Sequence, residues 1–418
     1  MADDARSWGP DDIGAYLYYG YLPRIPQDLT LLPGWGLADG RAMEGSRHDD
    51  VVQQGMAAFA SAFDEVPDGP HIVPLSGGLD SRAILGELRR RVPVSEITTV
   101  TVGSPGSLDY ELSAAVAYAA GVRHVRIDLA QYRLTAQSLT STASRNDAPT
   151  WVFDAMYNRL IRERFGDGAV YWSGYLGSRL SSTKHLADDP DLIFECALDR
   201  FVELNRWSRS APLHPPDADL RGRLPVAPLA DNSSLGHDEQ LDLWIRQEHL
   251  TRPVNLPAGF RHQTPFTHPS LSTFLLSIPR TDGSRQRVYR DILLRAYPNL
   301  FALPTTANTG LALQPSRTSR LQWYGQRARR AVRRRLFRDR PDVLQANYLD
   351  LAHALRHRTD YREVTRDRLR NLQERGVTPW LDIERMWNEH QCRDANHATA
   401  LTLLVSLDVH LDVAERGA

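Results

Sequence analysis

The segment Ser76–Ser81, which reads SGGLDS, combines residue types that suit the binding of a phosphate. Its two adjacent glycines let backbone N–H groups approach an anion closely, and a helix that begins at such a loop adds the positive end of its dipole. Ser76 and Ser81 offer hydroxyl donors, while Asp80 offers a carboxylate able to hold a divalent cation against the phosphate charge. The string does not end in the Gly-Lys-Ser/Thr of a Walker A loop. It therefore predicts a phosphate-binding loop of another type.

The segments around this loop predict alternating strands and helices. The apolar run at 71–75 precedes the loop, and a helical pattern follows it. Further strand-like runs lie at 97–103, 124–129 and 169–174, and helical stretches lie at 109–122, 131–144 and 151–165. This alternation predicts an α/β fold with a doubly wound parallel sheet covered on both faces.

Beyond about residue 186 the strand signal disappears and helical patterns dominate, which predicts an all-helical C-terminal half. We therefore expect three parts. Residues 1–50 form a remnant of an N-terminal region or a linker, 51–185 form the nucleotide-binding α/β domain, and 186–418 form the helical region that completes it.

The composition excludes several classes of protein. Of 418 residues, 42% are hydrophobic and 24% are charged, which argues against a disordered or collagen-like chain. The formal net charge of −1 argues against a protein that coats nucleic acid. No apolar run reaches the roughly 18 residues of a membrane span, and no signal-peptide pattern opens the chain. We expect a soluble cytoplasmic protein.

Lys184 is the only lysine among the 50 basic residues. Codon bias toward arginine explains the arginine count. A mechanism that needs a lysine must nevertheless use Lys184 or do without one, because arginine stays protonated and cannot shuttle a proton.

The loop Ser76–Ser81 resembles the PP-loop of ATP pyrophosphatases, and its surroundings are similar to the synthetase domain of the asparagine synthetase family. Four further stretches support this resemblance, which covers most of residues 12–315. They are TVGSPGSLD (101–109), AAVAYAAGVRHVRIDL (114–129), the Ser173-Gly174 pair, and TPF (264–266) with the helical stretch after it.

The resemblance implies an AMP-forming amide synthetase or cyclase of the PP-loop fold. In this family ATP adenylates a carboxylate, Mg²⁺ and the loop hold the pyrophosphate, and ammonia or an amine attacks the acyl-adenylate. Carried over to this chain, the loop residues Ser76, Gly77, Gly78, Leu79, Asp80 and Ser81 would bind pyrophosphate, and Asp80 would also bind the metal. Leu75, Val102, Ser173 and Gly174 would line the adenine and ribose pocket.

The sequence departs from the family pattern in the loop after Ser173. The family has an acidic loop there, whereas this chain reads SGYLGSRL over 173–180 and lacks all the acids. Tyr175 and Arg179 stand in this segment as candidate catalytic residues. A tyrosine acts as a base only with help, because its phenol has a pKa near 10.

A second departure concerns the lysine that the family carries late in the domain. The corresponding stretch, 302–313, has no basic residue. Lys184 is then either an exposed surface lysine or a relocated pyrophosphate-binding cation. Arg82, Arg179, Arg285 and Arg287 are the competing cations.

A third departure is that no glutaminase region with a cysteine nucleophile precedes the synthetase segment, since Cys196 is the first cysteine. We expect ammonia or a substrate amine to come from elsewhere, in specialised natural product biosynthesis rather than asparagine supply. Two functions stay open: a working ATP-dependent carbon–nitrogen ligase, and a catalytically degenerate homologue that acts as a nucleotide-binding or scaffold partner.

Three other features stay open as well, as does the oligomeric state. The arginine run Arg327–Arg340 is either a solvated helix face or a surface for an anionic partner. His353 and His357 share a helix face, as a metal pair or as packing residues. Asp147 is either a substrate-facing carboxylate or a helix cap.

Overall fold

The computed structural model describes residues 8–26, 43–146, 148–189, 191–230, 235–280, 283–317, 321, 324–325 and 348–417. Within them, five strands form one parallel sheet in the order β3-β2-β1-β4-β5. The strands are β1 (His71–Pro74), β2 (Ile97–Gly103), β3 (Arg123–Asp128), β4 (Val170–Trp172) and β5 (Arg261–Gln263). The predicted doubly wound parallel sheet is confirmed.

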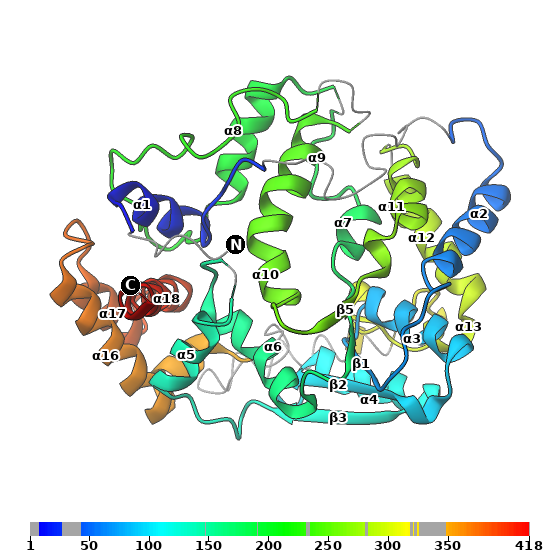
Figure 1. Cartoon of the computed structure of the whole chain (residues 1–418), viewed down its shortest axis with the longest axis horizontal. Coiled ribbons are helices and arrows are strands. Elements are labelled where there is room, and N and C mark those ends of the chain that lie inside the picture. Colours follow the sequence, from blue (N-terminus) through cyan, green and yellow to red (C-terminus); the bar gives the residue numbers. More distant parts are fainter. Residues whose placement is uncertain are drawn as a thin grey trace.

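Helices cover the two faces of this sheet, because successive strand side chains point to opposite sides. Ile72 belongs to one hydrophobic core and its neighbour Val73 to the other. Figure 1 shows α2, α3, α11, α12 and α13 gathered on one side, and α5, α6, α16, α17 and α18 on the other. The first group is α2 (His48–Ser61), α3 (Asp80–Arg91), α11 (Pro269–Leu276), α12 (Ser284–Ala296) and α13 (Pro298–Phe301). The second is α5 (Ala136–Ala143), α6 (Val152–Phe165), α16 (Thr359–Arg375), α17 (Ile383–Cys392) and α18 (Ala398–Gly417).

The remaining elements are α1 (Pro10–Tyr19), η3 (Val94–Glu96), α4 (Leu108–Ala120), α7 (Gly177–Leu180), α8 (Phe194–Leu204), α9 (His237–Leu241), the π-helix η4 (Asp242–Thr251), α10 (Arg252–Asn255), η5 (Pro265–Thr267), η7 (Thr306–Asn308) and α15 (Leu351–His357). Among them, α4 packs on β2 and β3 and enters the same core as α12, and α1 enters the core of α18. In the described part of the chain, no helix is long and apolar enough to cross a membrane.

The expectation of an all-helical C-terminal half needs one correction. Helices do dominate after residue 186, but this half also supplies β5, which pairs with β4 at the edge of the sheet. Three residues, Arg-His-Gln, are too short and too polar to carry a strand pattern. Helices of the second half also enter both cores, with α12 in one and α18 in the other.

Candidate functional site

The loop between β1 and α3 lies at the carboxyl end of the central strand. Strand β1 has β2 on one side and β4 on the other, so the order in which strands are added to the sheet reverses there. Open parallel sheets bind ligands at such a point. The loop closes on itself: the backbone N–H of Ser76 donates to Ser81 Oγ at 3.1 Å, and that of Gly78 donates to Ser76 Oγ at 3.1 Å. The serines that the sequence suggested as phosphate donors thus hold the loop together.

Arg82 holds the loop through the Gly77 carbonyl. Its side chain is fully buried, and its guanidinium donates to the carbonyl oxygens of Leu300 at 3.0 Å, Pro304 at 2.9 Å and Gly77 at 3.1 Å. The Thr305 hydroxyl also donates to the Gly77 carbonyl, at 2.8 Å. Because the Arg82 guanidinium donates to these backbone carbonyls, Arg82 stabilises the loop. Arg285, a second competing cation, is likewise buried and pairs with Glu239.

A cleft of about 520 Å³ opens in front of the loop. Its walls come from the ends of β1, β2 and β4, from α6 and from the π-helix η4. Most of the residues singled out in the sequence line it, namely Leu75, Ser76, Gly78, Leu79, Asp80, Ser81, Val102, Ser173, Gly174, Tyr175 and Arg179. Gly77 and Lys184 do not line this cleft.

Two carboxylates, Asp80 and Asp109, face the cleft. Asp80 accepts a hydrogen bond from the Tyr289 hydroxyl at 2.9 Å, and Asp109 accepts one from the backbone N–H of Gly77 at 2.8 Å. Burial raises the pKa of Asp80 to about 6 against the opposing effect of Tyr289, and it also raises the pKa of Asp109. A cation bound beside either carboxylate would favour its charged form and oppose this rise.

The segment that replaces the acidic loop packs directly on Asp80. A Cβ at Gly177 would lie 2.5 Å from Asp80 Cγ, and one at Gly174 would lie 3.1 Å from Asp80 Cβ. Leu176 between them has a φ of 67°, a left-handed conformation that is rare for a branched side chain. This turn brings the backbone of the segment against the Asp80 carboxylate.

Tyr175 does not stand alone in the cleft. Its hydroxyl donates to Glu248 Oε1 at 2.8 Å. Burial and the neighbouring Glu248 raise the pKa of Tyr175 far above its usual value, so the phenol stays protonated at neutral pH. Glu248 was missed in the sequence because it lies 73 residues away on η4 and belongs to no motif.

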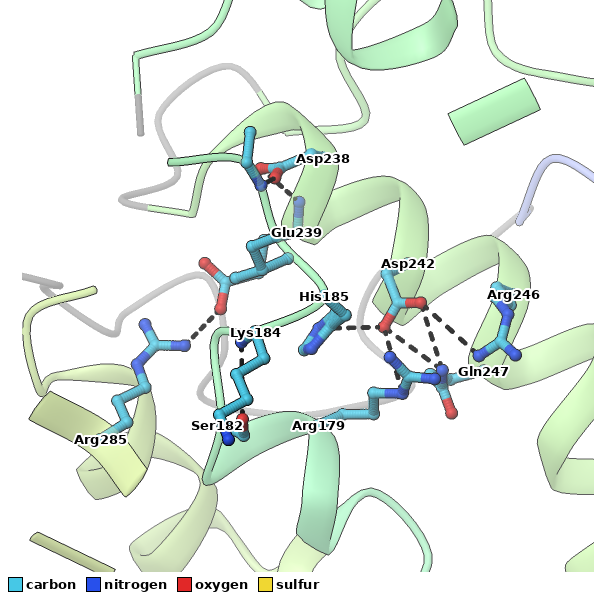
Figure 2. A network of polar contacts seen from close by, with 12 residues as sticks. Arg179, Ser182, Lys184, His185, Asp238, Glu239, Asp242, Arg246, Gln247 and Arg285 are labelled. Atoms are coloured by element: carbon cyan, nitrogen blue, oxygen red, sulfur yellow. Dashed lines mark hydrogen bonds and ion pairs between the residues drawn. The ribbon is translucent and has the colours of Figure 1, made fainter. Parts of the chain in front are cut away.

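The two candidate cations of this region are placed differently. Arg179 lines the cleft, with its Nε 3.9 Å from Asp242 Oδ2. Lys184 is exposed and lines a neighbouring pocket, and its backbone N–H donates to Ser182 Oγ at 3.4 Å. Figure 2 shows Arg179, His185 and Arg246 converging on Asp242.

Arg162 on α6 is a further lining residue that the sequence did not reveal. It is 3% exposed, and its guanidinium lies 4.1 Å from the centre of the Tyr171 ring. Its Nε and Nη1 have no hydrogen-bond partner in the described part of the chain. Burial lowers the pKa of Arg162 to about 10, so the side chain remains cationic. A buried cation with unused donors on a cleft wall suits an anionic ligand group.

His353 and His357 do not line the cleft. The rings of His353 and His357 lie 4.4 Å apart. Among the described residues, no group of three His, Cys, Asp or Glu is arranged to hold a metal ion. Cys196 and Cys392 are free and exposed. Arg327–Arg340 and Asp147 lie outside the described residues.

Fold and loop together define a PP-loop type of α/β protein with its cleft at the switch point of the sheet. Comparison with known families supports this class: residues 64–222 match the profile of the family described as asparagine synthase. This segment is therefore similar to a family of ATP-dependent synthetase type. The matched range includes the phosphate loop, both cleft carboxylates and the altered segment around Tyr175. No curated protein matches the chain.

Proposed function

We propose that the protein is an ATP-dependent carbon–nitrogen ligase. It adenylates a carboxylate and transfers the acyl group to an amine or ammonia, without hydrolysing glutamine itself. The observation that supports this proposal is the single cleft that joins the phosphate loop, Asp80 and Asp109 to the Ser173-Gly174 rim, inside the segment that matches the family.

ATP fits this cleft with its phosphates at the loop. Backbone N–H groups of a glycine-rich loop at a helix N-terminus suit the pyrophosphate portion. Leu75 and Val102, at the ends of β1 and β2, provide an apolar wall for adenine, and Ser173 with Gly174 borders the ribose and α-phosphate. Arg179 and Arg162 add positive charge to the walls.

The two carboxylates suit Mg²⁺ bound together with ATP. Mg²⁺ is commonly held by one or two carboxylates plus substrate phosphates rather than by a cage of protein ligands. Asp80 and Asp109 supply that number, and burial without a neighbouring cation raises the pKa of both. Bound there, the metal would neutralise charge on the triphosphate.

The Tyr175–Glu248 pair can remove the proton that the attacking amine must lose. The protonated phenol cannot accept a proton by itself. If its own proton passes along the 2.8 Å hydrogen bond to Glu248, the phenol oxygen takes one from the amine in the same step. One proton then moves from the amine to the Tyr175 oxygen and one from Tyr175 to Glu248, and the charges balance.

A nucleotide-binding scaffold is the second candidate function. The Asp80 carboxylate is engaged by Tyr289 and covered by Gly177, and the acids of the family loop are missing. These features favour bound nucleotide without turnover.

Exchange of labelled pyrophosphate into ATP, measured with a panel of carboxylic acids, separates the two functions. The ligase predicts exchange with at least one acid and its loss in Asp80→Ala. Asp64→Ala, which removes an exposed carboxylate that does not line the cleft, is the control and should retain exchange. ATP binding without exchange with any acid would favour the scaffold, and exchange that survives Asp80→Ala would exclude this loop as the site.

Tyr175→Phe should lower amide formation by about a hundredfold or more, because it removes the proton relay. Pyrophosphate exchange should persist, since adenylation precedes the attack of the amine. Glu248→Gln should show the same split. Tyr118→Phe, at a tyrosine that is 89% exposed, is the matched control. Equal loss of exchange and amide formation would contradict a role confined to the transfer step.

A further inference from the structure

We propose that Arg162 of α6 binds the carboxylate that the reaction adenylates and holds it beside the α-phosphate of ATP. This inference rests on the proposed function. In the adenylation step, a carboxylate oxygen forms a bond to the α-phosphorus, the bond from that phosphorus to the bridging β-phosphate oxygen breaks, and pyrophosphate leaves. Arg162 exchanges no bond and no proton in this step; it binds and orients the attacking group.

Arg162 is a buried cation without an ion pair among the described residues. It is 3% exposed, its Nη2 donates to the carbonyl oxygen of Asn255 at 3.4 Å, and its Nε and Nη1 have no hydrogen-bond partner there. The guanidinium lies 4.1 Å from the centre of the Tyr171 ring and 5.6 Å from that of Phe260, and these contacts offset part of the cost of burial. Since buried charges are as a rule paired, a ligand anion is the partner that Arg162 lacks.

The other arginines of the cleft are in a different position. Of the described residues, Arg162, Arg179 and Arg246 are the arginines that line it. Arg179 lies 3.9 Å and Arg246 lies 3.8 Å from a carboxylate oxygen of Asp242 (Figure 2). The protein itself therefore compensates part of their charge, whereas the charge of Arg162 is left for a ligand.

Arg162 lies on the same face of β4 as Ser173. Its guanidinium covers the ring of Tyr171, two residues before Ser173. Ser173 continues the strand, because its backbone N–H donates to the carbonyl oxygen of Gln263 in β5 at 2.9 Å. Side chains two residues apart on a strand point to the same face. Because Ser173 borders the ribose and α-phosphate in the proposed function, a carboxylate bound to Arg162 would lie next to that phosphate.

The helical segment η4–α10 connects Arg162 with the proton relay. Helix η4 carries Glu248, the partner of Tyr175. It continues into α10, whose Asn255 lines the cleft and accepts the hydrogen bond from Arg162 through its carbonyl oxygen. The amine that the relay deprotonates must attack the carbon of the bound carboxylate. The carboxylate and the relay therefore need neighbouring walls of one cavity, and this segment contributes to both.

The nucleotide phosphates have partners other than Arg162. In the proposed function, the backbone N–H groups of the loop and a metal ion on Asp80 and Asp109 neutralise them. The reacting carboxylate receives no positive charge from the loop backbone. Arg162 offers it a permanent charge and unused N–H donors, and guanidinium groups bind carboxylates through paired donors.

Pyrophosphate exchange tests this assignment when the concentrations of acid and ATP are varied in turn. The acid used is the one in the panel that supports the fastest exchange. In Arg162→Met, the half-saturating concentration of the acid should rise at least about tenfold, the effect of losing a charged hydrogen bond. That of ATP should change by less than about twofold. Arg162→Lys should give a smaller rise for the acid, because its ammonium keeps the charge but not the planar set of donors.

The matched control is Arg159→Met, on the same helix. Arg159 is also largely buried, with 11% of its side chain exposed, but it pairs with Glu163 and does not line the cleft. Both half-saturating concentrations should stay at their native values in this variant. Thermal melts check that the variants are folded, and Arg162→Lys, which keeps the buried charge, provides the test if Arg162→Met does not fold.

Three results would overturn the inference. A rise for ATP that equals or exceeds the rise for the acid would assign Arg162 to the nucleotide. A lower maximal rate with both half-saturating concentrations unchanged would make Arg162 a structural residue. An equal rise for the acid in Arg159→Met would show that the packing of α6, rather than a contact with the carboxylate, sets the affinity.

The same measurement separates this inference from the proposed function. Exchange that is present in the native chain and insensitive to Arg162 overturns the inference alone. Absence of exchange with every acid overturns the ligase, and the inference falls with it.

Discussion

At the scale of single residues, the site depends on the close packing of two glycines, Gly174 and Gly177, against the Asp80 side chain. Gly174 and Gly177 lie against Asp80 where a side chain would collide with it. The turn at Leu176 therefore decides the shape of the site around Asp80, because a side chain cannot be added at Gly177 without moving the carboxylate.

Gly177→Ala tests whether this packing positions Asp80. A Cβ there would lie 2.5 Å from Asp80 Cγ, so the carboxylate must move away. We expect pyrophosphate exchange to fall roughly a hundredfold, the cost of displacing a catalytic group by about an ångström. Gly168→Ala is the control, because a Cβ at that position meets nothing within 4 Å. Exchange that stays at the native level in Gly177→Ala would show that the position of Asp80 does not limit the reaction.

The sequence could predict the residues of the site that share a local string, and it missed those that tertiary structure brings in. SGGLDS between a strand and a helix carries its own geometry, so Ser76, Asp80 and Ser81 could be named in advance. Only the packing of η4 and α6 brings Glu248 to Tyr175 and Arg162 to the cleft. Lys184 was a candidate because it is the only lysine in the sequence, and that count contains no information about where its side chain lies.

Helices and strands, like single residues, are predicted from the sequence where they follow a local pattern and missed where they do not. Strands β2 and β3 and helices α4 and α6 follow clear apolar patterns, and they were predicted nearly to the residue. For η4 the sequence predicts a helix at about 238–250 but not the π form, because a wider backbone turn leaves no distinct periodicity in a single sequence. This helix nevertheless supplies Arg246, Gln247 and Glu248 to the cleft and its border.

The C-terminal helices are joined at His390 of α17, whose side chain is fully buried. Its Nδ1 accepts a hydrogen bond from the backbone N–H of His397 at 3.1 Å, and Arg356 of α15 donates to its carbonyl oxygen at 2.8 Å. Burial, aided by the Arg356 charge, lowers the pKa of His390 from 6.5 to about 4. The folded protein therefore favours the neutral ring.

This shift predicts acid sensitivity. The unfolded chain binds a proton at His390 below about pH 6.5, whereas the folded chain resists it down to about pH 4. Stability should therefore be complete above pH 6.5 and fall as the pH drops from 6.5 to 4. His390→Asn keeps an acceptor for the His397 N–H but cannot titrate, so its melting temperature should depend less on pH across that window. Parallel melting curves for the two proteins would contradict this assignment.

At the scale of the whole molecule, two cores share one sheet, and the two halves of the chain contribute to both. Helix α18 is the main buried helix of one core, with Leu401, Leu404 and Val405 fully buried. It contacts α5, α6 and α16, so it links the C-terminal helices to the α/β part. The sequence patterns predicted the helices but not this arrangement, because a helix that is apolar on every side does not say which neighbours surround it.

Asp408 of α18 forms ion pairs with two arginines of the neighbouring helix α16. Its carboxylate is fully buried and lies 3.2 Å from Arg368 Nη1 and 3.0 Å from Arg375 Nε, both on α16. Burial raises the pKa of Asp408, and the two arginines oppose that shift. Because removal of one partner leaves buried charge unpaired, Asp408→Ala should lower the free energy of unfolding by about 3 kcal/mol or more.

Chemical denaturation of Asp408→Ala measures this cost, and Asp367→Ala is its control. Asp367 also pairs with an arginine on α16, but both side chains are mostly exposed, so its loss should cost less than about 1 kcal/mol. Since Asp408 does not line the cleft in front of the Ser76–Ser81 loop, pyrophosphate exchange per folded molecule should stay at the native level in Asp408→Ala. Equal destabilisation by the two variants would mean that burial adds nothing to the Asp408 pairs. Loss of exchange in the folded variant would instead mean that α18 controls the geometry of the cleft through α6.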